Sequence, residues 1–177
     1  DACWTRQKGL ACTIMVADCL PVLFCNKTGT QVGAAHAGWR GLCGDASGGV
    51  LEHIFKHFMH LARTETAQDA IETVASDWLV WLGPCIGPRA FEVGPEVREA
   101  FVAADAQAKA CFVAQTGGKY LANLPALARQ RLAALGISQI YGNDGSSAWC
   151  TVSQPSKFFS HRRDGVSGRF AASIWLA

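Results

Sequence analysis

The sequence lacks a long apolar run and a strong net charge. No stretch of about 18 apolar residues could span a bilayer, and no basic, apolar leader opens the chain. Lys and Arg number 16 against 14 Asp and Glu, for a net charge of +2, which excludes a global field that would attract nucleic acid or an anionic membrane. We expect a soluble, cytoplasmic protein without a nucleic-acid or membrane partner, acting as a monomer or small homo-oligomer.

Internal repeats and low-complexity tracts are also absent from the sequence. Half of the 177 residues are apolar, enough for a sizeable core, so we expect one folded domain over residues 1–177. The chain starts at Asp1 without a methionine and runs into an apolar segment that needs neighbours. We therefore expect that the domain lacks its N-terminal segment.

Disulfides are not required in a domain of this size, although the chain has eight cysteines. The cysteines are spread along the sequence, and several lie inside apolar runs. We interpret them as free thiols in a reducing compartment. They are Cys3, Cys12, Cys19, Cys25, Cys43, Cys85, Cys111 and Cys150.

The first third of the chain predicts a sheet edge that gathers reactive side chains. Residues 10–25 are rich in β-branched and large apolar residues and predict two short buried strands that meet at a corner near Asp18. After a polar turn, residues 30–36 predict a strand that pairs back as a hairpin. This hairpin would bring Cys19 and His36 to the same end of the sheet.

The rest of the chain mixes helices and strands without strict alternation. This mixture predicts an α/β (α+β) fold with a central mixed sheet and helices packed over it. The polar segment 63–77 is interpreted as an insertion. The predicted helices are 48–61, 95–104 and 124–135, and the predicted strands are 78–82, 111–114, 137–141, an edge strand at 149–152, and 170–176.

Cys19 and His36 are the main candidates for chemistry. A thiolate and an imidazole can hold zinc or act as a nucleophile and its base, and Asp18 and Arg40 add charge beside them. A buried thiol with a structural histidine is the alternative. Catalytic zinc takes three protein ligands and an open position, so a zinc site needs a third ligand.

Two further groups of residues are weaker candidate sites. His53, His57 and His60 lie on or near one face of the predicted helix and favour a solvated face over a metal site. Cys85, between two Gly-Pro pairs, favours a buried apolar role over a third ligand.

The C-terminal arginines form another candidate site. Arg162 and Arg163 suit phosphate or carboxylate binding, or else they pair with Asp164 in a surface loop. The residues themselves favour neither alternative.

Four short segments of the sequence carry a more specific signal. HAGWRG and the RRDG-x-SGR pattern are highly specific, and together the segments resemble the YfiH family over essentially the whole chain. That family bears the older label of multicopper polyphenol oxidase, or laccase-like domain. The segments are 17–22 (ADCLPV), 36–41 (HAGWRG), 83–88 (GPCIGP) with 91–94 (FEVG), and 158–168.

The resemblance implies a zinc-dependent purine nucleoside phosphorylase with adenosine deaminase activity. The family's zinc ligands match Cys19 and His36, and a third ligand, an upstream histidine, has no counterpart in this sequence. The insertion at 63–77, Asn123 in place of aspartate and Cys85 in place of alanine depart from many relatives. The implied fold is a central mixed sheet flanked by helices, similar to the catalytic domain of cytotoxic necrotising factor.

The implied reaction is phosphorolysis of adenosine, inosine, guanosine or methylthioadenosine. Arg40, Arg162 or Arg163 would bind phosphate, with Cys19, His36 and Arg40 as catalytic residues. Zinc would also activate water for deamination, since it lowers the pKa of a bound water to about 7.

Other functions stay open for the same residues. One is a copper-dependent polyphenol oxidase, although five histidines are few and no His-x-His sets occur. Another is a metal-free Cys-His hydrolase or deamidase, and the last is a folded but inactive core.

Overall fold

A computed structural model describes residues 1–65 and 73–177 of the chain. Its centre is a five-stranded mixed sheet in the order β1-β4-β3-β5-β9. The pairs along it are antiparallel except β5 with β9, which is parallel. The strands are β1 (Ala2–Thr5), β3 (Leu20–Asn26), β4 (Val32–Ala37), β5 (Trp78–Leu82) and β9 (Gln139–Gly142).

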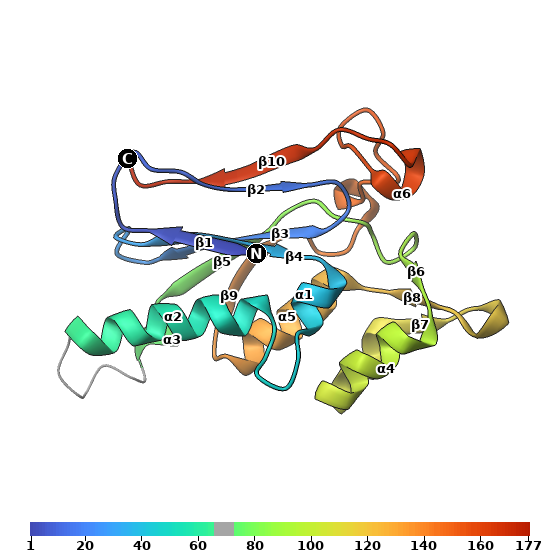
Figure 1. Ribbon diagram of the computed structural model, residues 1–177, viewed down its shortest axis with the longest axis horizontal. Helices are drawn as coiled ribbons and strands as arrows, with labels where there is room; N and C mark the ends of the chain where they lie inside the picture. The colour runs from blue at the N-terminus through green and yellow to red at the C-terminus, as the bar shows by residue number, and fades with distance from the viewer. Residues whose placement is uncertain (66–72) are drawn as a thin grey trace.

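A two-stranded ribbon covers one face of this sheet (Figure 1). The ribbon pairs β2 (Cys12–Val16) with β10 (Phe170–Ile174) in antiparallel register. Every second residue of β2 is buried, which is the alternation expected of a strand with one face toward a core. The ribbon therefore pairs an early strand of the chain with its last strand above the central sheet.

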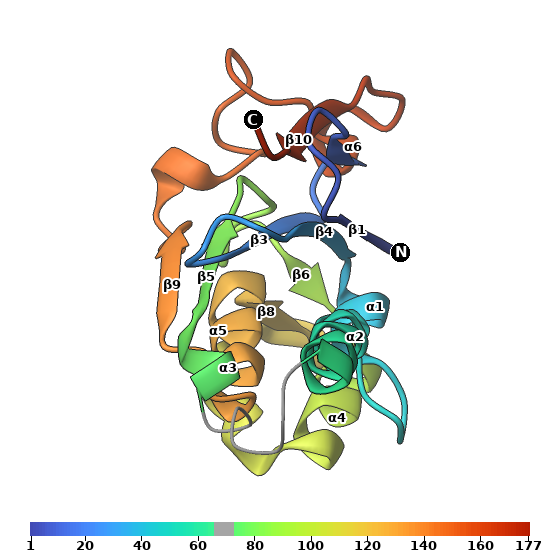
Figure 2. The ribbon, with the colours of Figure 1, turned by 90° about the vertical axis from the view of Figure 1, so that its left-hand side faces the viewer.

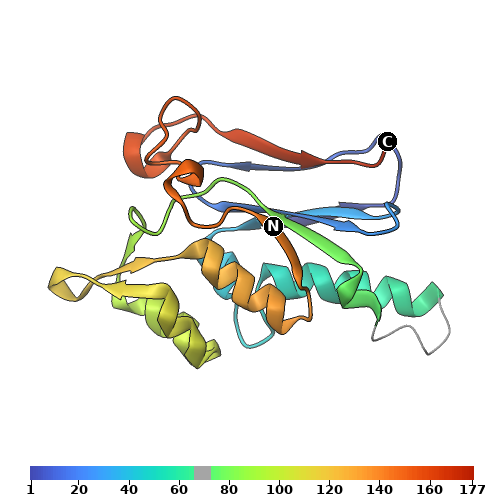
Figure 3. The same cartoon turned by 180° about the vertical axis from the view of Figure 1, so that it is seen from behind.

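Helices cover the opposite face, with α5 lying beside α2 beneath the sheet (Figures 1 and 3). A small antiparallel sheet, β6-β8-β7, and the helix α4 extend this layer at one end (Figure 1). Seen end-on, β6, β8 and α4 lie on the helix side of the central sheet (Figure 2). The helices are α1 (Trp39–Cys43), α2 (Val50–Glu65), α3 (Thr73–Ser76), α4 (Pro95–Ala104), α5 (Leu124–Ala134) and α6 (His161–Asp164). The small strands are β6 (Glu92–Val93), β7 (Phe112–Ala114) and β8 (Tyr120–Ala122).

Aromatic stacking joins α2 to the central sheet. The ring of Phe58 stacks on Trp78 with centroids 4.1 Å apart, and it meets Phe24 edge-on at 5.7 Å. Gly33 on β4 leaves room for this ring, because a Cβ at that position would lie 2.8 Å from Phe58. The helix layer and the sheet therefore share one closely packed core.

The predicted central mixed sheet with helices is confirmed, but helices cover only one of its faces. The strand 78–82 and the helix 95–104 have the predicted bounds. None of the helices in the described ranges is long and apolar enough to cross a bilayer. The predicted insertion at 63–77 lies partly outside the described residues.

The predicted edge strand at 149–152 is wrong. The chain forms a short 3₁₀ turn over Ser147–Trp149, and Cys150 makes only an isolated bridge to Cys85. The amide of Cys150 donates to the carbonyl of Ser147, and only the two bonds of the bridge, from Cys85 N–H to Trp149 and from Thr151 N–H to Cys85, reach the neighbouring segment, so no strand ladder forms. An apolar stretch of four residues cannot distinguish these outcomes.

Candidate functional site

The corner between β2 and β3 brings Cys19 to the end of β4. In the β3–β4 hairpin, Pro21 pairs with His36 and Leu20 pairs with Ala37. Cys19, directly before β3, therefore lies close to His36, as the sequence predicts. Both residues line a cavity of about 280 Å³, together with Gly38, Trp39, Arg40 and Gly41.

Burial shifts the pKa of both Cys19 and His36 toward the neutral form of the side chain. It raises the pKa of the Cys19 thiol, and the neighbouring Asp18 carboxylate raises this pKa further, while Arg169 opposes the shift. Burial lowers the pKa of the His36 imidazole. The protein alone therefore favours a neutral thiol and a neutral imidazole at neutral pH, and a cation at this position would favour the thiolate.

The two donors suit zinc in kind. A thiolate sulfur and a neutral imidazole nitrogen are its usual ligands. Within the part of the chain that the structure describes, no group of three or more His, Cys, Asp or Glu side chains is placed to hold a metal ion. Cys19 and His36 therefore supply two ligands of a set that needs at least one more.

A second cavity of about 190 Å³ adjoins the first and shares Cys19 and Trp39 with it. Its wall is mainly apolar, with Ile86, Phe91 and Leu124 contributing side chains from three separate segments. Such a wall suits a flat, poorly hydrated ligand group better than a phosphate. The remaining lining residues are Ala17, Asp18, His161 and Arg162.

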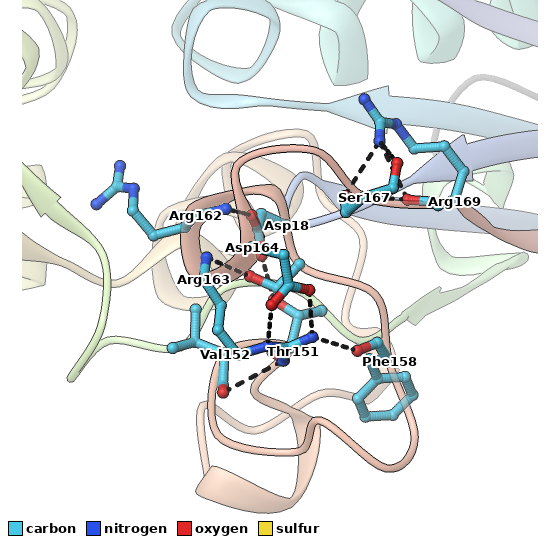
Figure 4. Close-up of polar contacts among 11 residues, drawn as sticks. Asp18, Thr151, Val152, Phe158, Arg162, Arg163, Asp164, Ser167 and Arg169 are labelled. Atoms are coloured by element: carbon cyan, nitrogen blue, oxygen red, sulfur yellow. Dashed lines mark hydrogen bonds and ion pairs between the residues drawn. The ribbon is translucent and has the colours of Figure 1, made fainter.

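Asp18 lines the apolar cavity and connects it to the C-terminal loop (Figure 4). Its Oδ1 accepts a hydrogen bond of 2.6 Å from the hydroxyl of Thr151, and its Oδ2 accepts one of 2.7 Å from the backbone N–H of Arg162. Its own carbonyl oxygen accepts from the N–H of Ile86 at 2.8 Å. Three distant parts of the chain therefore meet at this residue.

Arg162 lies on the wall of the apolar cavity. Its guanidinium carbon is 5.6 Å from the centre of the Phe91 ring, and its Nη1 donates to the carbonyl oxygen of Glu92 at 3.1 Å. The side chain extends away from Arg163, its neighbour in sequence (Figure 4). Arg162 is thus placed where a ligand in the apolar cavity would meet it.

Arg163 is occupied by contacts within its own loop (Figure 4). Its guanidinium makes two bonds of 2.7 Å to Asp164, and it donates to the carbonyl oxygens of Thr151 at 2.7 Å and Phe158 at 3.2 Å. Each guanidinium nitrogen has an acceptor, and this geometry favours a role in holding the loop. Substrate binding by Arg163 stays an untested prediction.

Arg40 is exposed at the rim of the cavity that contains Cys19 and His36. Its guanidinium carbon lies 4.4 Å from the centre of the Trp39 ring, a distance typical of a cation–π contact. This stacking leaves the edge of the guanidinium group available to an anion. Arg40 is the predicted phosphate-binding residue that lies beside Cys19 and His36.

Cys85 and the described histidines of α2 have the environments that the sequence analysis favoured for them. Cys85 is fully buried, burial raises the pKa of its thiol, and the Nδ2 of Asn143 donates to its sulfur at 3.4 Å. His53 and His57 are exposed on α2, with the ring of His57 4.9 Å from that of Trp4. The side chain of His60 lies outside the described residues.

Sequence reasoning overlooked the aromatic residues of the site. Trp39 and Phe91 belong to two of the family-like segments, but no side-chain role was predicted for either residue. The available signal was an aromatic residue beside a candidate ligand, as in HAGWRG. This signal becomes useful only when the tertiary structure shows that both rings line the same cavity.

All residues, 1–177, match the family described as multi-copper polyphenol oxidoreductase laccase. The chain belongs to this family. Purine nucleoside phosphorylase YfiH of Escherichia coli (strain K12) is 53% identical over 176 residues, covering 99% of this chain and 63% of that protein. Purine nucleoside phosphorylase PA4543 of Pseudomonas aeruginosa is 48% identical, covering 99% and 64%. The predicted YfiH resemblance is confirmed.

Other relatives carry different names or a solved structure. Adenosine deaminase RL5, from an unknown prokaryotic organism, is 32% identical and covers 99% of this chain and 62% of that protein. The crystal structure of Neisseria meningitidis protein NMB0706 aligns with a TM-score of 0.84 at 43% identity, covering 99% of this chain and 64% of that one. The chain thus spans less than two thirds of the length of these relatives.

Proposed function

We propose that this protein catalyses phosphorolysis of purine nucleosides, with adenosine deamination as a second activity of the same site. The observation that carries this proposal is the pair of adjoining cavities that share Cys19 and Trp39. One cavity contains the polar side chains of His36 and Arg40, while the other has an apolar wall that includes Phe91. The names of the family relatives support the same reaction class.

We propose zinc as the cofactor, held by the thiolate of Cys19 and the imidazole of His36. A histidine upstream of the 177 residues, as the family resemblance implies, or solvent would complete the set. When bound, zinc supplies Lewis acidity beside the reacting atoms. Copper with polyphenol oxidation is the second candidate, because the family description names that chemistry.

The two cavities suggest how a nucleoside would bind. The planar base would enter the apolar cavity between Trp39 and Phe91, where aromatic side chains exclude water. The ribose would then lie near Cys19, which both cavities share. Phosphate, held by Arg40, would attack the anomeric carbon as the glycosidic C–N bond breaks, and the base would leave with a proton.

A metal-free Cys-His hydrolase is less well supported. A nucleophilic cysteine needs a depressed pKa or a charged partner, whereas burial and Asp18 raise the pKa of Cys19. The same environment suits a thiol that loses its proton on binding a cation.

The proposed reaction has a direct test. The zinc-loaded protein is incubated with inosine and phosphate, and the products are separated by chromatography. We expect hypoxanthine and ribose 1-phosphate in equal amounts, and we expect inosine when adenosine is supplied without phosphate. Failure to form base or inosine, with copper-dependent oxidation of a phenol instead, would reverse the assignment in favour of the second candidate.

Arg40 provides a prediction specific to phosphate. The Arg40→Met variant keeps an apolar side chain over Trp39 but loses the charge. A charge-assisted hydrogen bond contributes about 1.5–3 kcal/mol, so we expect the KM for phosphate to rise by about 10-fold or more. The KM for the nucleoside should change little, as steady-state kinetics with each substrate varied in turn would measure.

The matched control is Arg98→Met, because Arg98 also stacks on an aromatic ring, that of Tyr120, at 5.1 Å. Arg98 lines neither of the two cavities described above. An equal rise in the phosphate KM for both variants would show that Arg40 has no specific role in phosphate binding.

A further inference from the structure

We propose that Asp18 is a positioning residue, which holds the C-terminal wall of the apolar cavity against the β2–β3 corner. Asp18 precedes the candidate zinc ligand Cys19, but its carboxylate points toward Thr151 and the start of α6 (Figure 4). The contribution of this wall to substrate binding rests on the proposed function. The two hydrogen bonds of Asp18 are independent of that proposal.

Both hydrogen bonds of the carboxylate join segments that lie far apart in the sequence. The bond to the Thr151 hydroxyl spans 133 residues, and the bond to the Arg162 N–H spans 144 residues. Thr151 is fully buried, so its hydroxyl is held at a defined position. Asp18 therefore ties two points of the C-terminal loop to one strand corner.

The bond to Arg162 satisfies one of the first amides of the short helix α6. The first amides of a helix lack partners within the helix. In α6, the side chain of Ser160 accepts from the N–H of Arg163 at 3.2 Å, and its carbonyl oxygen accepts from the N–H of Asp164 at 3.1 Å. The carboxylate of Asp18 accepts the N–H of Arg162 in the same turn, and therefore fixes the start of α6 against the β2–β3 corner.

The position of α6 determines the shape of the apolar cavity. His161 and Arg162 line that cavity, with the guanidinium of Arg162 over Phe91. If the Arg162 amide were released from Asp18, the guanidinium could leave the ring and the wall would open. We therefore expect Asp18 to act on nucleoside binding through Arg162 rather than by touching the substrate.

The backbone at Asp18 limits which residues could replace it. Its φ is +98°, in the region that favours glycine and, among other residues, asparagine and aspartate. No other non-glycine residue within the described ranges has a positive φ. The position thus requires both an unusual backbone conformation and two hydrogen-bond acceptors.

These requirements can be separated by substitution. In Asp18→Asn the amide oxygen can accept from the Arg162 N–H while the amide nitrogen donates to the Thr151 hydroxyl, so both bonds can persist without the charge. Asp18→Gly allows the same φ but removes both bonds. Thr151→Val removes one bond from the opposite partner. Asp45→Gly is a control, since Asp45 caps an exposed turn by bonds to Ser47.

The experiment measures amide hydrogen exchange of residues 160–164 and the KM for inosine in each variant. We expect exchange about 10-fold faster or more in Asp18→Gly, a smaller increase in Thr151→Val, and protection close to wild type in Asp18→Asn and Asp45→Gly. The KM should rise in the same order, by about 10-fold in Asp18→Gly, with a smaller change in kcat. Zinc content should stay at the wild-type level.

Several results would overturn the proposal. Exchange as fast in Asp18→Asn as in Asp18→Gly would mean that the charge matters rather than the two bonds. Unchanged exchange in Asp18→Gly and Thr151→Val would mean that Asp18 does not hold the C-terminal loop in place. Loss of zinc with an unchanged KM would assign Asp18 to the metal site. If the wild type does not turn over inosine, the proposed function fails, and the exchange data alone decide the role of Asp18.

Discussion

Cys19→Ala and His36→Ala should each remove zinc and reduce purine nucleoside phosphorolysis by more than about 100-fold. Mutation of a residue that only hydrogen-bonds to a metal ligand already reduces metal affinity or activity by about 10–100-fold. These substitutions remove a ligand itself. The geometry supports this expectation, since both side chains line one cavity at the joined ends of β3 and β4. Elemental analysis of the purified variants and a product assay measure the two effects.

Matched controls of the same residue types are available outside the site. Cys25→Ala removes a partly buried thiol from the far end of β3, and His57→Ala removes an exposed imidazole from α2. Both controls should keep zinc and activity near the wild-type level. If Cys19→Ala and His36→Ala also kept zinc, the metal would lie elsewhere and the proposed site would be wrong.

Loss of the Phe58 ring should produce the largest change in stability. Phe58 is 1% exposed and contacts both Trp78 and Phe24, so Phe58→Ala leaves a cavity between α2 and the sheet. Such deletions cost about 3–5 kcal/mol in the free energy of unfolding. We expect a Tm lower by about 10 °C, measured by calorimetry or by circular dichroism at increasing temperature.

The same deletion at an exposed position is the control. Phe159 is 48% exposed, so Phe159→Ala should change the free energy of unfolding by no more than about 1 kcal/mol. Equal losses at the two positions would mean that the contacts of Phe58 with Trp78 do not carry the stability of the helix–sheet interface.

The sequence predicted the proximity of Cys19 and His36 because it depends on local pattern. Alternating and continuous apolar runs identified the strands, and the turn after residue 25 required the second strand to return beside the first. Register within a hairpin then placed the two side chains at one edge. The family-like motifs identified the same pair independently, although its metal and reaction remain proposals.

The sequence did not separate Arg162 from Arg163. The two residues are adjacent and chemically identical, and the structure directs one toward Phe91 and the other into its own loop. Their directions depend on α6, a helix of four residues that is too short to leave a periodic signal. For the same reason, residues 149–152 were predicted as a strand, whereas the chain turns at 147–149 and makes only an isolated bridge at Cys150.

By itself, the sequence determined the strands, the longer helices, the family and the candidate pair Cys19 and His36. Periodicity and turn residues act over a few positions, so these features can be inferred without a third dimension. Only the tertiary structure decided that Asp18 meets Thr151 and Arg162, and that Trp39 and Phe91 line one cavity. Such contacts form when the ribbon, the sheet and the helix layer pack together, and no local pattern encodes contacts between segments that lie so far apart in the sequence.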